Sequence, residues 1–177
     1  MDKQMLRWNG WGLCDAPDTL GDKAEGIWQW LGAYTGSGVL PHTPACALED
    51  IVMPPVRLVP EQLRALEEIL PGSRVKTDRF ERAYHARGRS YHDMLHLRCG
   101  RLEHAPDAVV YPQTVEEVGA VVRYADRNAV ALVPYGGGSS VVGGVTPLLR
   151  EGQHAVVTVD MALMNRILEI DKHTMTA

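Results

Sequence analysis

Apolar positions in residues 102–177 predict a strand, a helix and a second strand, in that order. The two strands are the apolar runs Ala108–Tyr111 and Val130–Val133, and the proline directly after each run is expected to end it. The helix between them is expected from Val115 to about Asn128. Since a crossover helix connects parallel strands, this order predicts a parallel β-sheet in the second half of the chain.

Two local signals support that helix. Thr114 followed three positions later by Glu117 is a capping box, which satisfies backbone groups at the start of a helix. The expected buried positions recur at the spacing of one helix face: Val118, Val121, Val122 and Ala125. Alternating polarity after the second strand predicts further strands beside this unit, at Val157–Val159 and Ile167–Ile170.

Periodicity is weaker in the first 101 residues, which nevertheless contain several helix signals. A short amphipathic helix is expected around Lys23–Tyr34, and the prolines of Pro41–Pro60 predict an extended connector after it. Pro60 then begins a second helix, which the pair Pro71-Gly72 ends. The apolar positions of this second helix are Leu63, Leu66, Ile69 and Leu70.

Two more helical segments are expected before residue 101. One runs from Asp78, a candidate N-cap, to Gly88, where glycine is typical of a helix end. In the other, three side chains fall on one helical face: Tyr91, Leu95 and Arg98. These signals predict an irregular, partly helical extension over residues 1–101, ahead of an α+β unit over residues 102–177.

The overall composition is that of a folded protein without a membrane span. Of 177 residues, 45% are hydrophobic and 23% are charged, and uncharged apolar runs are no longer than a strand. The first residues lack the basic-then-apolar order of a signal peptide, which predicts a cytoplasmic location. Cys14, Cys46 and Cys99 match neither a zinc nor a disulfide spacing, so we expect reduced and mostly buried thiols.

Charge is unevenly distributed along the chain. The formal net charge is −4, which gives no overall attraction to nucleic acid, but residues 74–101 hold eight basic and three acidic residues. One interpretation of this stretch is a solvated pair of basic helices. The other is that Arg87, Arg89 and Arg98 serve the structure or bind an anionic substrate, and we expect no nucleic-acid partner because no motif for one is present.

Three histidines lie in the same stretch: His85, His92 and His96. A spacing of four residues can place His92 and His96 on one helix face, as in a pair of metal ligands. No third ligand of suitable spacing accompanies them, so we interpret the histidines as structural and predict no metal site.

The segment that follows the second strand is the candidate binding site: Pro134, Tyr135, Gly136, Gly137, Gly138, Ser139, Ser140 and Val141. Consecutive glycines let a ligand approach the backbone closely, and successive amide groups can surround an anion such as a pyrophosphate. The segment lacks the lysine of a Walker loop, and Val141 stands where a Rossmann loop has glycine or alanine. A glycine-rich surface loop without a ligand is the alternative.

Residues 106–144 (PDAVVYPQTVEEVGAVVRYADRNAVALVPYGGGSSVVGG) resemble the start of the flavin domain of the vanillyl-alcohol oxidase superfamily. The resemblance implies an α+β FAD-binding domain of the PCMH type, of which this chain holds the first βαβ part, with the glycine loop at the FAD pyrophosphate. Members that bind FAD covalently often do so through a histidine in or near this loop. Because residues 134–145 contain neither histidine nor cysteine, noncovalent FAD is expected.

Three segments narrow the resemblance to the alkyldihydroxyacetonephosphate synthase family: RWNGWG (Arg7–Gly12), HARGRSYHDMLHLRCG (His85–Gly100) and VTVDMALMNRILEID (Val157–Asp171). The family resemblance implies an FAD enzyme of ether-lipid assembly, which exchanges the acyl chain of an acyl-dihydroxyacetone phosphate for a fatty alcohol. Two alternatives stay open: an FAD-linked 2-hydroxyacid oxidase or dehydrogenase, and a noncatalytic remnant that acts as a binding module.

Members of this family are several times longer, so the resemblance implies that the chain is the N-terminal piece of a larger flavoenzyme. The lipid-like substrate is then expected to bind mainly in the missing C-terminal part, and no catalytic residue is assigned. The oligomeric state is open. We expect the chain alone to have no turnover and to hold FAD weakly, because one loop supplies few of the contacts that offset lost translational and rotational freedom.

Overall fold

The computed structural model describes residues 3–17, 20–40, 44–71 and 73–176. Its centre is a four-stranded sheet in the order β1-β2-β4-β3. The strands are β1 (Val75–Lys76), β2 (Ala108–Val110), β3 (Val130–Tyr135) and β4 (Ala155–Asp160). β2 and β3 each pair in parallel with β4, and β1 pairs antiparallel with β2. The predicted parallel sheet and α+β class are confirmed; the short β1 has no clear sequence signal.

The two strands predicted on either side of the crossover helix are parallel but are not neighbours. β4 lies between them, so that Val157 is in register with both Ala108 and Leu132. Every residue of β4 is buried, as is typical of a central parallel strand covered on both faces. The strand predicted at Val157–Val159 is therefore present and lies at the centre of the sheet.

Pro134 does not end β3, contrary to the prediction. The strand continues to Tyr135, and Pro134 is in register with Val159. β3 forms one edge of the sheet, where a proline is tolerated because its missing N–H need not reach a neighbouring strand. The two additional residues bring Tyr135 into register with Asp160, at the carboxyl ends of two parallel strands.

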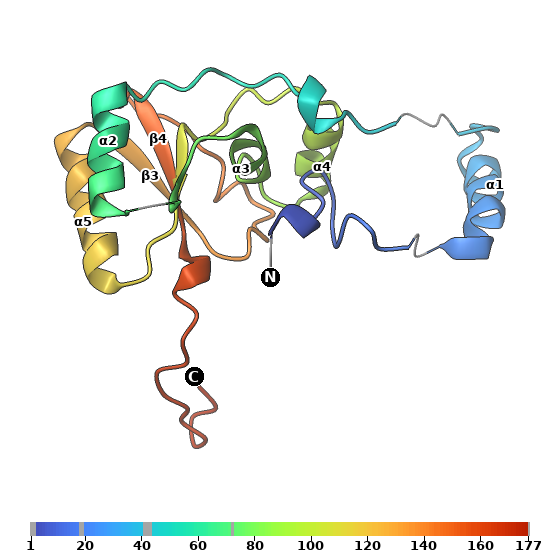
Figure 1. Ribbon diagram of the computed structural model, residues 1–177. Helices are drawn as coiled ribbons and strands as arrows, with labels where there is room; N and C mark the ends of the chain where they lie inside the picture. The colour runs from blue at the N-terminus through green and yellow to red at the C-terminus, as the bar shows by residue number, and fades with distance from the viewer. Residues whose placement is uncertain (1–2, 18–19, 41–43, 72, 177) are drawn as a thin grey trace.

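Helices cover both faces of the sheet, as Figure 1 shows. α2 (Pro60–Ile69) and α5 (Val115–Arg127) lie on one face, and α3 (Arg79–Tyr84) and α4 (Tyr91–Arg98) lie beyond the other. All four fall in segments predicted to be helical. α3 begins after Asp78, whose side chain accepts a hydrogen bond from the amide of Glu81, but it ends before the predicted Gly88 because the chain turns there toward the glycine loop.

α5 packs through a slightly different face from the predicted one. Val121 and Ala125 are buried, whereas Val122 is 50% exposed. Tyr124 takes its place in the core, and its hydroxyl donates to the carbonyl oxygen of Gln62 in α2. The predicted burial of Val122 is therefore wrong, because contact with α2 rotates the apolar face toward Tyr124.

The remaining predictions for the ends of the chain have mixed outcomes. α1 (Ala24–Thr35) forms as predicted and lies apart from the sheet (Figure 1). Residues 44–59 are extended except for a short 3-10 turn at Leu48–Asp50, while residues 41–43 and 72 lie outside the described part of the chain. No strand forms at Ile167–Ile170, so this prediction is wrong.

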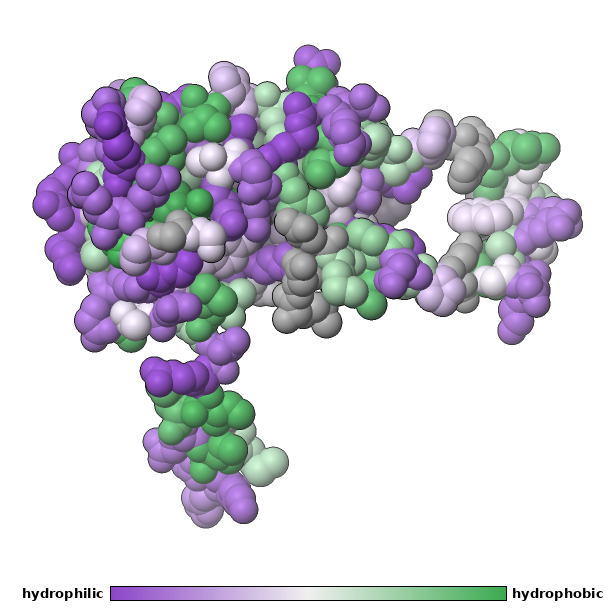
Figure 2. Space-filling model, viewed as in Figure 1, coloured by the Kyte–Doolittle hydropathy of each residue, from purple (hydrophilic) through white to green (hydrophobic). Residues whose placement is uncertain are grey.

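The position of the C-terminal segment explains why no strand forms at Ile167–Ile170. Residues 164–176 extend away from the sheet (Figure 1), and Figure 2 shows apolar side chains along them. Ile167, Leu168 and Ile170 are exposed there, and no described strand lies beside them to accept their backbone hydrogen bonds. Alternating polarity forms a strand only when a neighbouring strand is present.

Two further sequence-based expectations concern thiols and membranes. Cys14 and Cys99 are exposed, and Cys46 is partly buried. All three are free, but the prediction that they are mostly buried is wrong, because Cys14 lies in a turn, Cys46 in an extended segment and Cys99 at the end of α4. Within the described residues, no helix has both the length and the apolar character that a membrane crossing requires.

Candidate functional site

The glycine loop leaves the sheet at the carboxyl end of β3, where the parallel strands β3 and β4 both end. Ligands of open α/β sheets bind outside this edge, because the loops that leave the strands surround a crevice there. Two segments distant in the sequence meet the loop at this edge. They are an N-terminal turn, Leu6–Leu13, and the connection from α3 to α4, residues 85–90.

The predicted site residues have different positions around this loop. Tyr135 and Gly138 are buried, Ser140 is half-buried, and five others are exposed: Pro134, Gly136, Gly137, Ser139 and Val141. Gly137, Ser139 and Val141 line a cavity of about 400 Å³, which the N-terminal turn and Arg89 also line. Pro134 remains within β3 and does not line the cavity.

The three consecutive glycines are needed for different reasons. Gly138 has φ +67°, and a Cβ there would lie 2.0 Å from the hydroxyl oxygen of Tyr135. Gly136 and Gly137 have ordinary φ values, and a Cβ at either would meet no other atom within 4 Å. Gly138 is therefore required by the fold of the loop, whereas Gly136 and Gly137 border open space that a ligand can enter.

Tyr135 places a buried hydroxyl directly beneath the loop. Its side chain is 1% exposed, and among the described residues the hydroxyl has no hydrogen-bond partner. Burial raises the pKa of Tyr135 to about 12, so the phenol keeps its proton at neutral pH. A buried, protonated hydroxyl without a partner is unusual in a folded protein, and a bound ligand is one group that could supply the missing acceptor.

The loop is held on its other side by the connection from α3 to α4. The amide of Arg89 donates to the carbonyl oxygen of Ser140 at 2.8 Å. Gly88 makes this approach possible, because a Cβ there would lie 2.1 Å from the same oxygen. The Ser140 hydroxyl accepts from the amide of Gly144 at 2.9 Å, so this oxygen shapes the loop while its proton can still be donated.

A polar cluster that is buried at His85, Tyr111 and Asp160 and partly buried at Lys3 and Glu81 lies behind the site. The Asp160 carboxylate pairs with the Lys3 ammonium and lies 2.8 Å from Nε2 of His85, while Nδ1 of His85 lies 2.7 Å from the carbonyl oxygen of Glu81. Tyr111 donates to Glu81. The cluster thus joins the N-terminus, α3 and the end of β4 at one point.

The pKa shifts in this cluster follow from burial. Burial lowers the pKa of His85 to about 3, with smaller effects from Lys3 and Arg89, and outweighs the Glu81 carbonyl, which favours the charged ring. Burial likewise lowers the pKa of Lys3 to about 8. The ring of His85 packs edge-on against that of Tyr135, with centroids 4.4 Å apart, so the cluster fixes the tyrosine under the loop.

The basic stretch is structural to a large extent, and the interpretation as a solvated helix pair is wrong. Arg82 is buried and donates to the carbonyl oxygens of Pro106 and Pro54. Arg74 forms two hydrogen bonds with Glu117. Arg87 lies 3.7 Å from the Asp93 carboxylate. These arginines hold α3, α4 and α5 to their surroundings. Of the three arginines expected to serve the structure or to bind an anion, Arg87 thus has a structural contact.

His85, one of the three histidines, is structural as predicted, since its ring is fully buried. His92 and His96 lie in α4 and are exposed. Within the residues that the structure describes, no group of three or more histidine, cysteine, aspartate or glutamate side chains is arranged to hold a metal ion.

Comparison with known proteins shows which proteins this chain is similar to. Residues 106–177 match the family described as an FAD binding domain. An alkyldihydroxyacetonephosphate synthase from Dictyostelium discoideum is 37% identical over 98% of this chain and 32% of its own length. The chain is thus similar to an alkyldihydroxyacetonephosphate synthase over almost all of its own length. It spans about a third of the length of that relative.

Two further comparisons show how much of this chain is similar to the synthases and how much to another class of enzyme. A structure of an alkyldihydroxyacetonephosphate synthase matches 96% of this chain and 35% of its own, with a TM-score of 0.78 and 29% identity. A mitochondrial D-lactate dehydrogenase from Arabidopsis thaliana is 30% identical over only 67% of this chain and 19% of its own length. The synthase similarity therefore includes the N-terminal residues, and the dehydrogenase similarity is weaker.

FAD is the cofactor of the matched domain family, and the loop residues fit its anionic diphosphate. The space beside Gly136 and Gly137 is open, and the Tyr135 hydroxyl lacks an acceptor. The sequence identified this loop from its glycines. It did not identify Lys3, Asp160 or Glu81. Asp160 ends a buried strand and Lys3 lies near the N-terminus, which are weak signals, and Glu81 has none.

Proposed function

We propose that this chain provides the FAD diphosphate site of an alkyldihydroxyacetonephosphate synthase, an enzyme of ether-lipid biosynthesis. The extent of the similarity carries the proposal. It covers 98% of the chain, and so includes the N-terminal turn and the α3–α4 connection that line the cavity, while the FAD binding domain match covers only residues 106–177. A noncatalytic remnant would not need to retain the N-terminal turn and the α3–α4 connection.

In the proposed enzyme, the acyl chain of an acyl-dihydroxyacetone phosphate is exchanged for a fatty alcohol. FAD supplies the reactive centre when bound. The residues of this chain bind and orient it: the amides of Gly136, Gly137 and Gly138 face the diphosphate, and the hydroxyls of Ser139 and Ser140 donate to it. Binding is noncovalent, since residues 134–145 offer no histidine or cysteine for attachment.

The residues proposed to form the FAD site are those of the segment from Pro134 to Val141. Gly137, Ser139 and Val141 line the cavity, whereas Pro134 and Tyr135 belong to β3 and support the loop from the sheet. No residue of this chain is assigned to catalysis, and the substrate is proposed to bind elsewhere in the enzyme. The cytoplasmic location and the absence of a nucleic-acid partner remain predictions.

Gly137→Val tests the FAD site, and we expect it to abolish FAD binding while the fold is kept. A valine side chain would occupy the open space beside the loop, where a diphosphate is proposed, and its Cβ would meet no protein atom within 4 Å. Equilibrium dialysis measures the FAD affinity, which for the unaltered chain is expected to be weak, with a Kd above about 1 µM.

Gly26→Val is the matched control, because Gly26 lies in α1 and its Cβ position is also open. This control is expected to bind FAD as the unaltered chain does. Thermal unfolding should show Gly137→Val to be folded, with a stability change within about 0.5 kcal/mol. Unchanged FAD affinity in folded Gly137→Val would show that the diphosphate lies elsewhere.

A chimera separates the synthase proposal from the 2-hydroxyacid dehydrogenase alternative. This chain replaces the matching third of the Dictyostelium synthase, and the ether product is measured. We expect synthase activity to be retained, because both walls of the cavity are kept together. In the corresponding chimera with the Arabidopsis D-lactate dehydrogenase, we expect no activity. The reverse result would favour the dehydrogenase.

A further inference from the structure

The cavity beside the glycine loop has a wall that the FAD binding domain match does not include. Its volume is about 400 Å³, and its lining includes Arg7, Trp11, Tyr84 and Arg89 as well as Gly137 and Ser139 of the loop. These four residues precede residue 106, where the domain match begins. Two of them are arginines, and among the described residues that line the cavity none is acidic. The lining is therefore cationic.

Arg7 is held at this wall by a tight turn. Leu6 and Leu13 form an antiparallel bridge, and the amide of Arg7 donates to the carbonyl oxygen of Gly12 at 3.0 Å. The guanidinium is fixed by two more hydrogen bonds, from Nε to the carbonyl of Leu13 and from Nη2 to that of Ala16. A guanidinium held in place before a ligand binds loses little side-chain freedom on binding.

Arg89 is fixed from the other side. Its backbone amide is hydrogen-bonded to Ser140 in the glycine loop, and its guanidinium carbon lies 4.9 Å from the ring centroid of Tyr84. Tyr84 is itself 7% exposed and therefore a rigid support. Arg89 is thus joined to the glycine loop through its backbone, and its side chain lines the same cavity as the exposed residue Gly137.

We propose that Arg7 and Arg89 complete an anion subsite for a diphosphate, opposite the amides of the glycine loop. The inference rests on the proposed FAD function and extends it to the N-terminal residues. Two guanidinium groups can form charge-assisted hydrogen bonds with the oxygens of two linked phosphates, while the Tyr135 hydroxyl below the loop lacks an acceptor. The ligand group is the diphosphate that FAD shares with ADP, rather than a single phosphate monoester.

The test compares ligands that differ in their phosphates. FAD, ADP, riboflavin and glycerol 3-phosphate are each titrated by equilibrium dialysis against the 177-residue chain and the variants Arg7→Gln and Arg89→Gln. We expect each variant to weaken FAD and ADP binding about tenfold, since each loses one charged hydrogen-bond donor. Riboflavin, which has no phosphate, should bind equally to all three proteins.

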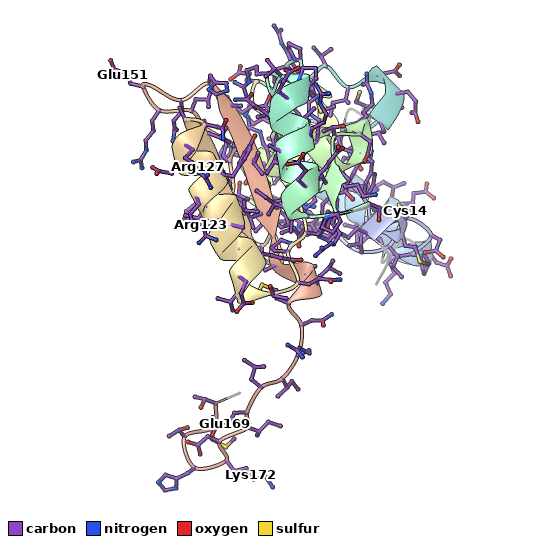
Figure 3. All side chains as sticks on the ribbon, turned by 60° about the vertical axis from the view of Figure 1, so that its left-hand side comes forward. Cys14, Arg123, Arg127, Glu151, Glu169 and Lys172 are labelled. Carbon is purple, nitrogen blue, oxygen red and sulfur yellow. The ribbon has the colours of Figure 1, made fainter. Side chains whose placement is uncertain are left out.

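Arg123→Gln is the matched control. Arg123 is exposed on α5, and Figure 3 shows it on a different part of the molecule from Cys14, which follows the N-terminal turn. This variant removes one positive charge from the same chain, so unchanged ADP affinity in it would show that the Arg7 and Arg89 effects are local. Thermal unfolding checks that each variant is folded.

The outcomes separate the subsite from the FAD function. Equal ADP affinities in the unaltered chain, Arg7→Gln and Arg89→Gln would overturn the subsite even if FAD binds, and so would an unaltered chain that does not bind ADP. Loss of glycerol 3-phosphate binding without loss of ADP binding would assign the arginines to a phosphate monoester. ADP binding that depends on both arginines, in a chain that does not bind FAD, would support the subsite and contradict the FAD function.

Discussion

Asp107→Ala is expected to lower the free energy of unfolding by about 3 kcal/mol. Asp107 is fully buried directly before β2, and its carboxylate serves two distant segments. Oδ1 accepts from the amide of Arg57 at 2.6 Å, and Oδ2 accepts from the Arg57 guanidinium at 3.0 Å and from the amide of Val156 at 2.7 Å. The substitution leaves these donors without their acceptor.

The expected loss of unfolding free energy depends on whether each donor that bonded to Asp107 can find another partner after the substitution. The Val156 amide lies in the central strand β4, away from water, and an unsatisfied buried donor costs about 1–3 kcal/mol. Arg57 is about one-third exposed at its side chain, so its guanidinium can recover hydration and adds less than a buried charge would. The rest of the expected loss comes from breaking the connection between Arg57, in the extended segment before α2, and Asp107 beside the sheet.

Urea denaturation followed by circular dichroism measures this effect. Asp126→Ala is the control, since Asp126 is exposed at the end of α5 and its removal should change the stability by less than about 0.5 kcal/mol. Asp107→Asn keeps the shape and part of the hydrogen bonding, and should lie between the two. A change for Asp107→Ala no larger than that of the control would contradict the structural role.

Gly138→Ala is expected to destabilise the protein by about 2–4 kcal/mol. Gly138 has φ +67°, in the left-handed region that costs a residue with a Cβ about 1–2 kcal/mol. The added Cβ would also lie 2.0 Å from the hydroxyl oxygen of Tyr135 and 2.4 Å from its Cζ. The ring cannot yield easily, because Tyr135 is buried against His85 and the sheet.

Gly137→Ala is the control for this substitution, one residue away in the same loop. Its Cβ would meet no atom within 4 Å and its φ is ordinary, so we expect a stability change of less than about 0.5 kcal/mol. Thermal and urea unfolding of both variants give the comparison. Similar stabilities for the two alanine variants would show that Gly138 does not adopt the strained conformation.

Local patterns were sufficient to predict most of the helices and the class of the sheet. Pro60, Thr114 and Asp78 stand at or directly before the starts of α2, α5 and α3, and helix starts depend on residues only a few positions apart. Capping and helical spacing act within one or two turns, so the sequence alone contains the relevant interactions. The glycine loop was found in the same way, because a strand followed by three glycines is a local signal.

Register and burial depend on contacts between distant segments. The insertion of β4 between β2 and β3, the extension of β3 through Pro134, and the absence of a strand at Ile167–Ile170 all depend on which strand becomes a neighbour. The exposure of Val122 depends on how α5 meets α2. A single strand or helix carries no information about its partner, so these features were decided only by tertiary packing.

The sequence by itself determined that the chain contains a βαβ unit ending in a glycine loop, and residues 106–144 identified the family of that loop. Only the tertiary structure decided what surrounds it. Lys3 and Arg7 from the N-terminal segment, Arg89 from the α3–α4 connection and Asp160 from β4 come from three separate segments, and the fold brings them to the carboxyl ends of β3 and β4. A binding site made from such segments has no spacing along the chain, because the distances that matter are set by the folded backbone.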